Sequence, residues 1–154
     1  MLNRRALLLA SASILVTSRL AAAESFEFTK TDAEWQAILT ETQYLVLRQA
    51  KTETAGTSPL LNEHRDGTYN CAGCDLAIYS SSTKYESGTG WPSFFDVLPS
   101  AVGTTPDNTL FVTRTEVHCR RCGGHLGHVF DDGPAPTGKR YCMNGAALTF
   151  HPQG

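Results

Sequence analysis

The sequence predicts a mainly β domain: a mostly antiparallel sheet or small barrel with short helices at its N-terminal end. Helix-start signals cluster between residues 31 and 50. From Tyr69 onward the helical period disappears, and short β-branched or aromatic runs alternate with Gly, Pro, Asp and Ser. Two CxxC pairs in this β-rich part fit a structural zinc site that would pin a small frame.

Residues 1–23 have the pattern of a secretory signal peptide. Arg4 and Arg5 form a positive n-region, residues 6–16 are an apolar run, and residues 21–23 offer the small residues of a cleavage site before Glu24. The run is shorter than the roughly 20 apolar residues that span a bilayer. We therefore expect an exported, periplasmic bacterial protein. The paired arginines favour the twin-arginine route, while general secretion and a buried N-terminal helix stay open as alternatives.

Residues 24–154 are expected to form a single domain of 131 residues, long enough to bury its own core. The signal segment holds three arginines and no acidic residue, so its removal takes the net charge from −2 to −5. A domain this acidic lacks the basic face that nucleic-acid binding requires. No second hydrophobic segment follows, so we expect a mature form that does not span a membrane. We also expect a monomer.

Two capping boxes predict two short helices between residues 31 and 50. Thr31 can cap the first helix while Glu34 reaches back, and Thr40 and Gln43 repeat the pattern. Residues 26–28 are expected to form a short strand before the first helix. After the helices, the polar, Gly- and Pro-containing residues 51–68 predict an ordered loop that wraps the domain.

The remaining chain predicts several short strands bounded by turn residues. In the longest of them, Leu110, Val112 and Val117 are expected on the apolar face, while Arg114 and Glu116 point the other way. The expected strands are residues 69–71, 76–79, 109–118, 125–130, 141–143 and 146–150.

Four of the five cysteines form two CxxC pairs, Cys71 with Cys74 and Cys119 with Cys122, separated by 44 residues. Each pair can place two sulfurs on one ion from a tight turn. Four thiolates make a closed tetrahedral site, which is the structural rather than the catalytic arrangement for zinc. The sequence therefore predicts one structural Zn²⁺.

Two other uses of these cysteines stay open: a pair of structural disulfides, common in exported proteins, and an iron–sulfur cluster. A disulfide within CxxC is usually a redox pair, so two pairs of this form favour zinc. Gly73, Gly123 and Gly124 are expected to give the two turns their backbone freedom.

Cys142 is the cysteine that the metal site leaves over. An odd thiol in an exported protein indicates reactivity or intermolecular pairing. Lys139 and Arg140 are cationic neighbours that favour the thiolate, and His125 and His128 could reach Cys142 if their strand lies alongside. The alternatives are a buried inert cysteine and histidines that serve as sheet partners or spare metal ligands.

Several fragments, taken together, resemble the B-type methionine sulfoxide reductases. The two CxxC pairs match the zinc site of that family, and the similarity runs from Asp32 to Phe150. HLGHVF and RYC-x-N are specific in combination. The matching fragments are TGWPSF at 89–94, HLGHVF at 125–130, DGP at 132–134 and RYCMN at 140–144.

The resemblance implies a fold and a reaction. The implied fold is two antiparallel sheets curved into a small barrel-like body, with short N-terminal helices and a structural zinc site. The implied reaction is reduction of the R epimer of methionine sulfoxide, since different reductases serve the two epimers. Cys142 matches the nucleophile, which would become a sulfenic acid.

The resemblance also implies roles for the residues around Cys142. A sulfoxide oxygen leaves only when it is protonated, which a histidine can accomplish near neutral pH. An indole face can hold the methyl group and shield the sulfur from water. The implied set is His125, His128 and Asn144 around the sulfoxide oxygen, Arg140 supporting the thiolate, and Trp91 and Phe130 lining an apolar methyl pocket.

One position departs from the family pattern. Many members carry a resolving cysteine directly before Gly-Trp-Pro-Ser-Phe, where this chain has Thr89. No other unligated cysteine exists to form an intramolecular disulfide. The sulfenic acid would then be attacked by an external thiol or by a zinc-site cysteine at the expense of the metal. We expect the external thiol, either a thioredoxin-like protein or a small thiol, to regenerate the enzyme.

Two other functions are compatible with parts of the sequence. The first is a zinc-ribbon protein-binding module without catalysis, which would leave Cys142 and its cationic neighbours unexplained. The second is a disulfide oxidoreductase that uses a CxxC pair, which one zinc ion held by those cysteines would exclude.

Overall fold

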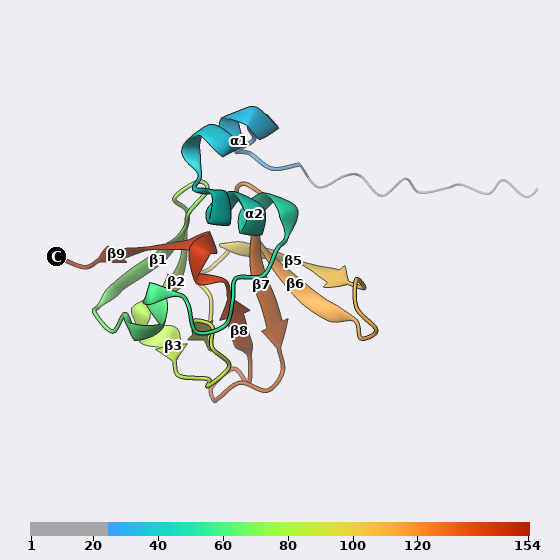
Figure 1. Ribbon diagram of the computed structural model, residues 1–154. Helices are drawn as coiled ribbons and strands as arrows, with labels where there is room; N and C mark the ends of the chain where they lie inside the picture. Colours follow the sequence, from blue (N-terminus) through green and yellow to red (C-terminus); the bar gives the residue numbers. More distant parts are fainter. Residues whose placement is uncertain (1–24) are drawn as a thin grey trace, which may run out of the picture.

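Two short helices begin the part of the chain that the computed structural model describes, residues 25–154 (Figure 1). They are α1 (Asp32–Ile38) and α2 (Glu41–Gln49). Each begins with the predicted capping box: Thr31 caps α1 while Glu34 reaches back, and Thr40 and Gln43 do the same for α2. The predicted signal peptide lies outside the described residues and stays a prediction.

The strand predicted at residues 26–28 is wrong. This segment is a bend whose Phe28 N–H donates to the Arg121 carbonyl at 3.0 Å. The Phe28 ring meets Trp35 of α1 edge-on at 5.8 Å, and the Arg121 guanidinium lies 5.5 Å from its centroid. The alternating aromatic residues therefore pack on a helix and a turn, where no strand edge is available to pair with them.

A three-stranded antiparallel sheet has the order β2-β1-β9. Its strands are β1 (Gly67–Cys71), β2 (Ala77–Ser80) and β9 (Leu148–Pro152). The strand predicted at residues 146–150 begins later, because Gly145–Ala147 forms a 3₁₀ turn, η3, with its own hydrogen bond from Ala147 N–H to the Asn144 carbonyl. Two more such turns, η1 (Pro59–Asn62) and η2 (Ser81–Thr83), occur within and after the predicted loop.

A six-stranded antiparallel sheet has the order β3-β4-β8-β7-β6-β5. The fold prediction of a mainly β body with two antiparallel sheets is confirmed, and among the described residues neither sheet closes into a barrel. The strands are β3 (Lys84–Tyr85), β4 (Ser93–Phe94), β5 (Val102–Asp107), β6 (Arg114–Cys119), β7 (His125–Phe130) and β8 (Arg140–Met143).

The strand predicted at residues 109–118 is wrong in its first half. β6 begins only at Arg114, and Leu110 and Val112 are exposed in the loop that joins β5 to β6. Sequence reasoning also missed β5, which contains Pro106. Proline is tolerated there because β5 is an edge strand, where one backbone face needs no donor.

The core lies between the two sheets. Tyr79 of β2 stacks on Phe94 of β4 with centroids 4.2 Å apart, and Tyr69 of β1 meets the same ring at 4.9 Å. The Tyr79 hydroxyl donates to Met143 Sδ at 3.0 Å. Because successive strand residues face opposite sides, burying Met143 against this core turns Cys142 to the other face of the six-stranded sheet.

The two helices cover one end of the sheets, with α2 lying over the start of β7 (Figure 1). Within residues 25–154, no helix has the length and apolar character needed to cross a bilayer.

Candidate metal centre and active site

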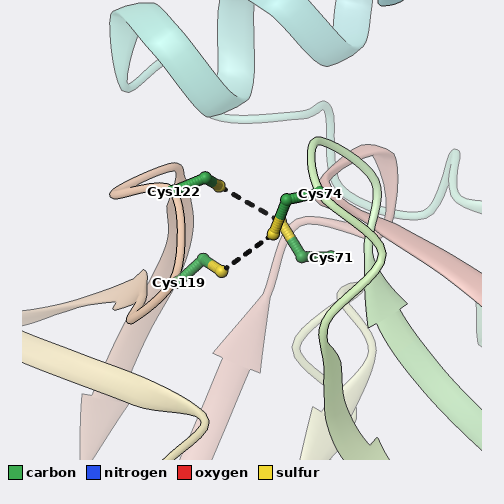
Figure 2. A group of neighbouring side chains, drawn as sticks. All are labelled: Cys71, Cys74, Cys119 and Cys122. Atoms are coloured by element: carbon green, nitrogen blue, oxygen red, sulfur yellow. Dashed lines mark hydrogen bonds between the residues drawn. The ribbon is translucent and has the colours of Figure 1, made fainter. Parts of the chain in front are cut away.

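The four cysteines of the two CxxC pairs meet at one point, as predicted. Figure 2 shows their side chains converging from two turns, one between β1 and β2 and the other between β6 and β7. All four are buried, and their sulfur atoms lie within 4.8 Å of one another. Cys71 Sγ lies 3.6 Å from Cys122 Sγ, and Cys74 Sγ lies 3.5 Å from Cys119 Sγ.

These separations fit one metal ion and not disulfides. A disulfide bond is about 2.05 Å long, and all five cysteines are free. Four thiolates about 2.3 Å from a tetrahedral zinc ion lie roughly 3.8 Å apart, close to the two shortest separations found. Four soft sulfur donors in a closed shell suit zinc or iron. The chain therefore has a four-cysteine centre that could hold one metal ion, consistent with a structural zinc site.

The two turns that carry the cysteines are built alike. The residue four positions after the first cysteine donates its N–H to that cysteine's carbonyl, from Asp75 to Cys71 and from Gly123 to Cys119, both at 2.8 Å. Both residues adopt the left-handed backbone conformation, with φ of 60° at Asp75 and 68° at Gly123. Aspartate tolerates this conformation better than most residues. The first turn therefore uses Asp75, and the predicted need for freedom at Gly73 is wrong.

Arginine side chains hold both turns from outside. Arg48 of α2 donates to the Cys122 carbonyl at 3.0 Å, and Arg121 donates to the Cys74 carbonyl at 3.1 Å. A Cβ at Gly124 would lie 2.9 Å from Leu47 Cδ2, so a larger residue there would displace this buried side chain of α2. The metal turn is thus bound to the helix layer, and β7 starts from it at His125.

Cys142 lies in a row of polar residues that crosses the whole six-stranded sheet. Strand register pairs Cys142 with Ser93 on one side and His128 on the other, and pairs His128 with Glu116. Directly opposed residues of antiparallel strands share a face, with Cβ atoms about 4.5–5.5 Å apart. The strand that carries the histidines therefore lies alongside Cys142, which is the condition under which the sequence allowed them to reach its thiol. The full row is Tyr85, Ser93, Cys142, His128, Glu116 and Thr105.

A bulge in β7 brings the second histidine to the same face. Residues three apart on a regular strand point to opposite sides. The pairing of β6 with β7 shifts between Val117–Gly127 and His118–His125, so that β7 holds one extra residue. The His125 and His128 rings consequently lie 5.5 Å apart.

Each histidine donates to a carboxylate that the sequence did not single out as a partner. His128 Nε2 lies 2.8 Å from Asp107 Oδ2, and His125 Nδ1 lies 2.6 Å from Glu116 Oε1. A carboxylate only accepts, so these nitrogens carry hydrogens and the opposite ring nitrogens are left for other partners. Burial lowers the pKa of His128, and the hydrogen bond from His125 lowers the pKa of Glu116.

A cavity of about 120 Å³ opens on Cys142. It brings together Trp91, His128, Phe130, Cys142 and Asn144, five of the seven residues predicted around the reaction centre. Sequence reasoning missed Thr52, Arg114 and Gly127, which complete the lining.

The two remaining predicted residues, His125 and Arg140, lie behind the wall of this cavity. Arg140 makes a two-pronged ion pair with Asp132, at 2.8 and 2.9 Å, and its guanidinium carbon lies 4.3 Å from the Phe130 ring centroid. The hydrogen bond to Asp132 raises the pKa of Arg140. Arg140 therefore fixes the Phe130 ring and places a permanent positive charge two residues from Cys142.

Asn144 and Trp91 are held by the same backbone segment after α2. Asn144 Oδ1 accepts from Glu53 N–H at 2.8 Å, and Asn144 Nδ2 donates to the Leu126 carbonyl at 3.0 Å. Trp91 Nε1 donates to the Glu53 carbonyl at 2.9 Å, and the Glu53 carboxylate accepts from Gly145 N–H at 2.7 Å. Residues 51–68 therefore wrap the domain as predicted, and Glu53 links two walls of the cavity.

Three charged residues of the site carried only a weak sequence signal. Arg114 and Glu116 were expected on one face of a strand, and that face is the one that carries His128. Asp107 binds both Arg114, at 2.6 Å, and His128. Asp107 is the last residue of β5, a strand that the sequence pattern did not predict, so nothing in the sequence singled it out.

Fold and site together define a class: a small two-sheet β protein with a four-cysteine metal centre and a separate cysteine–histidine pocket. The SelR domain family matches residues 39–152. The relatives include peptide methionine sulfoxide reductases MsrB of Thiobacillus denitrificans, 52% identical over 80% of this chain and 95% of that protein, and of Methanosarcina barkeri, 53% identical over 79% and 86%.

A plant protein extends the same comparison. Peptide methionine sulfoxide reductase B1, chloroplastic, of Arabidopsis thaliana is 49% identical over 84% of this chain and 65% of its own length. The chain therefore belongs to the B-type methionine sulfoxide reductase family, as its sequence motifs indicated.

Proposed function

We propose that this protein reduces the R epimer of protein-bound methionine sulfoxide, and of the free amino acid, to methionine. Family membership makes it an oxidoreductase that acts on methionine sulfoxide. The observation that supports the finer statement is the register of β8 with β7, which places the Cys142 thiol beside His128 in the wall of one cavity.

The first step moves the sulfoxide oxygen to the enzyme. The Cys142 thiolate attacks the substrate sulfur, a proton reaches the oxygen, and methionine leaves while Cys142 becomes a sulfenic acid. One oxygen atom is transferred, the substrate sulfur is reduced, and the Cys142 sulfur is oxidised. His128 is the residue placed to supply the proton: its ring lines the cavity, Asp107 binds the Nε2–H, and the protonated form of the ring would release its proton from Nδ1.

The apolar half of the cavity selects the substrate. Trp91 and Phe130 line it, and Arg140 stacked on Phe130 keeps that ring in place. These faces can hold the methyl group while the oxygen points toward the polar row. Fixing the methyl group and the oxygen distinguishes R from S when the methionine chain also enters from a fixed side, because the two epimers then exchange the chain and the lone pair.

The second step needs a thiol from outside the chain. Thr89 Oγ1 lies 3.7 Å from Cys142 Sγ, so the neighbouring position that could carry a resolving cysteine carries a hydroxyl. The other four cysteines are buried in the metal centre. A thiol of a thioredoxin-like protein, or a small thiol, would attack the sulfenic acid, form a mixed disulfide with Cys142 and release water. A second thiol, from the same protein or another small molecule, would then reduce the mixed disulfide, return Cys142 to the thiol and leave the donor as a disulfide.

The decisive experiment compares the separated R and S epimers of N-acetyl-methionine sulfoxide with dithiothreitol as reductant. We expect turnover of R only, and a loss of at least about 10³-fold in Cys142→Ser, because an alcohol is not ionised at neutral pH. Turnover of neither epimer by a folded, metal-loaded protein would overturn the proposal. A protein-binding module held by the metal centre would then be the better account.

The source of the second thiol has its own test. After a single turnover without reductant, mass spectrometry should find Cys142 as a sulfenic acid that dimedone captures. A disulfide between Cys142 and any cysteine of the same chain would refute regeneration by an external thiol.

We also propose that the metal is one zinc ion, with no role in the chemical step. Cys71, Cys74, Cys119 and Cys122 would supply all four ligands, leaving no open position for substrate. Metal analysis of the purified protein should give one zinc per chain. Iron with the visible absorption of a cluster would contradict this assignment.

Export to the periplasm rests on residues 1–23 alone. We propose that they direct export and are removed before Glu24. N-terminal sequencing of the protein recovered from a periplasmic fraction tests both points, and an intact N-terminus retained in the cytoplasm would contradict them.

A further inference from the structure

Three hydroxyl side chains form a hydrogen-bonded chain that leads away from the Cys142 sulfur. Thr89 Oγ1 lies 3.7 Å from Cys142 Sγ, and Ser87 Oγ lies 2.8 Å from Thr89 Oγ1. Ser93 Oγ lies 2.7 Å from Ser87 Oγ and 3.1 Å from the carbonyl oxygen of Trp91. The contacts are continuous from the reactive sulfur to a backbone acceptor.

Each hydroxyl carries one hydrogen, so an unbroken run of donors from Cys142 to the Trp91 carbonyl has one direction and an unbroken run of donors toward the sulfur has the opposite one. With Cys142 as a thiol, its S–H donates to Thr89, and each hydroxyl donates onward until Ser93 donates to the Trp91 carbonyl. With Cys142 as a thiolate, every hydroxyl turns around, and the Thr89 hydroxyl donates to the sulfur. The same three side chains can therefore satisfy either state of Cys142.

The two directions are not equal in strength. A hydrogen bond to an ionised acceptor is roughly twice as strong as one between neutral groups. Reversal gives up two neutral bonds, the weak S–H bond to Thr89 and the bond from Ser93 to the Trp91 carbonyl, and gains one bond to a charged sulfur. Ser93 is 1% exposed, and Thr89 and Ser87 are half-buried, so water competes poorly for the inner part of this chain.

We propose that Thr89, oriented by Ser87 and Ser93, is a positioning residue that holds the Cys142 thiolate by hydrogen bonding. The proposal rests on the proposed function only in naming Cys142 as the nucleophile. It gives Thr89 a role of its own at the position where many relatives carry a second cysteine.

Other groups also act on this sulfur and must be kept constant. Tyr85 and Arg140 interact electrostatically with Cys142, from β3 and from β8 itself. His128 is its direct neighbour on β7, and Arg114 lines the same cavity. None of these four changes when Thr89 is replaced, so a shift in thiol titration reports the hydroxyl.

The test is the pH dependence of Cys142 alkylation by iodoacetamide, followed by mass spectrometry of the zinc-loaded protein. Thr89→Val keeps the shape of the side chain and removes the hydroxyl, while Thr89→Ser keeps the hydroxyl. We expect the valine variant to titrate about one pH unit higher, which lowers alkylation about 10-fold at neutral pH. The serine variant should stay within about 2-fold of the unmodified protein.

A second variant protects the test from a folding defect. Ser87→Ala leaves Thr89 in place but removes the hydroxyl that orients it, so we expect a smaller shift in the same direction. Equal midpoints for the valine and serine variants, or equal loss in both, would overturn the proposal. Because alkylation needs no substrate, this result is independent of whether the sulfoxide is reduced.

A separate observation concerns the loop between β5 and β6, residues 108–113. Leu110, Phe111 and Val112 are 58%, 110% and 72% exposed, and they follow one another at the free end of the hairpin (Figure 1). The base of the loop is polar and ordered, since Thr113 Oγ1 donates to Asn108 Oδ1 at 2.7 Å. The three apolar residues are therefore exposed at the tip of a loop whose base is fixed by a hydrogen bond.

The supporting strands lead directly to the cavity. Arg114, the residue that starts β6, lines the cavity, and its ion-pair partner Asp107 ends β5 and binds His128. A free amino acid fills only the cavity. A polypeptide entering with its oxidised methionine has flanking residues outside the cavity, and the loop ends one residue before Arg114 in the cavity lining.

We infer that residues 110–112 bind the apolar residues that flank methionine sulfoxide in a polypeptide substrate. This rests on the proposed function and names its substrate class. Arg114 follows this loop in the chain and lines the cavity, so the loop continues into the substrate site. For this reason we favour the substrate, rather than another protein, as what the loop binds.

The test compares two R-sulfoxide substrates, N-acetyl-methionine sulfoxide and a peptide with leucine on both sides, with dithiothreitol as reductant. A triple variant, Leu110→Ser, Phe111→Ser and Val112→Ser, should lose about 10-fold in kcat/KM on the peptide, the equivalent of one buried apolar side chain. The small substrate should change less than about 2-fold. Ile38→Ser, at another exposed apolar residue on α1, should change neither.

Equal loss on both substrates, or no loss on the peptide, would overturn the inference. Failure of the unmodified protein to reduce either substrate would instead remove the proposed function. A protein reductant takes no part in this assay, so docking of such a donor cannot produce the expected pattern.

Discussion

The metal centre and the Cys142 cavity are built in opposite ways. The metal centre collects four identical ligands from two similar turns, each closed by a hydrogen bond between residues four apart. The cavity collects different side chains from separate strands, and only register brings them together. A local pattern is enough for the first, whereas the second exists only once the sheet has formed.

The two regions are nevertheless joined through β7. This strand leaves the metal turn at His125 and carries His128 three residues later. A fixed turn between β6 and β7 sets the register in which these two strands pair, including the bulge. The position of His128 opposite Cys142 on β8 depends on that register. The comparison therefore predicts that damage to the metal centre affects the whole molecule, while damage to the cavity stays local.

The largest expected effect is the loss of a metal ligand. Cys119→Ser should abolish metal binding and cooperative thermal unfolding. A structural zinc site is worth about 10–16 kcal/mol in small domains, as much as the 5–15 kcal/mol that a whole domain has. Metal analysis and circular dichroism measure both. The matched control, Cys142→Ser, should keep the metal and the melting temperature; a stable, metal-free Cys119→Ser would contradict the comparison.

A smaller effect is expected from the carboxylate that binds His128, the proposed proton donor. Asp107→Asn keeps the shape of the side chain but removes the charge that orients His128 and pairs with Arg114. We expect kcat/KM to fall about 10- to 100-fold, part of the 10²- to 10⁴-fold that general acid catalysis contributes. Metal content should not change.

Its control is another aspartate in an ion pair. Asp131→Asn removes the exposed partner of Lys139, away from the cavity lining, and should alter kcat/KM less than about 2-fold. If the two variants lose the same activity, the Asp107–His128 contact has no specific role.

The smallest effect concerns stability in mild acid. Burial lowers the pKa of His128 in the folded protein, so below about pH 6.5 the unfolded chain binds more protons than the folded one. Stability should therefore fall as the pH drops from neutrality through this range. Urea unfolding from pH 7.5 to 5 measures the slope, and His128→Asn should flatten it. An unchanged slope in that variant would show that His128 titrates alike in both states.

The carboxylates of the site add to acid sensitivity at lower pH. Hydrogen bonds lower the pKa of Glu116, from His125, and of Asp132, from Arg140. A carboxylate whose pKa is lower in the folded than in the unfolded protein stabilises the fold at pH values above its unfolded pKa. This contribution is lost as the pH falls through its folded pKa.

Much of the fold was readable because its signals are local. The capping boxes at Thr31 and Thr40 involve residues three apart, and both helices begin where they predict. Local aromatic patterns failed where tertiary packing decided the outcome: residues 26–28 pack on a helix, and Leu110 to Val112 form an exposed loop. Pro106 concealed β5, because proline disfavours a strand everywhere except at an edge.

The sequence by itself predicted the four cysteines that converge and singled out Cys142 as the candidate nucleophile, since CxxC spacing brings two sulfurs together within a single turn and leaves Cys142 over. Only the tertiary structure decided the surroundings of Cys142. Asp107 and Glu116 became histidine partners, and Thr89 a neighbour of the sulfur, through strand pairing and one bulge. Contacts between residues far apart in sequence depend on register, and a shift of one residue would turn each side chain to the opposite face.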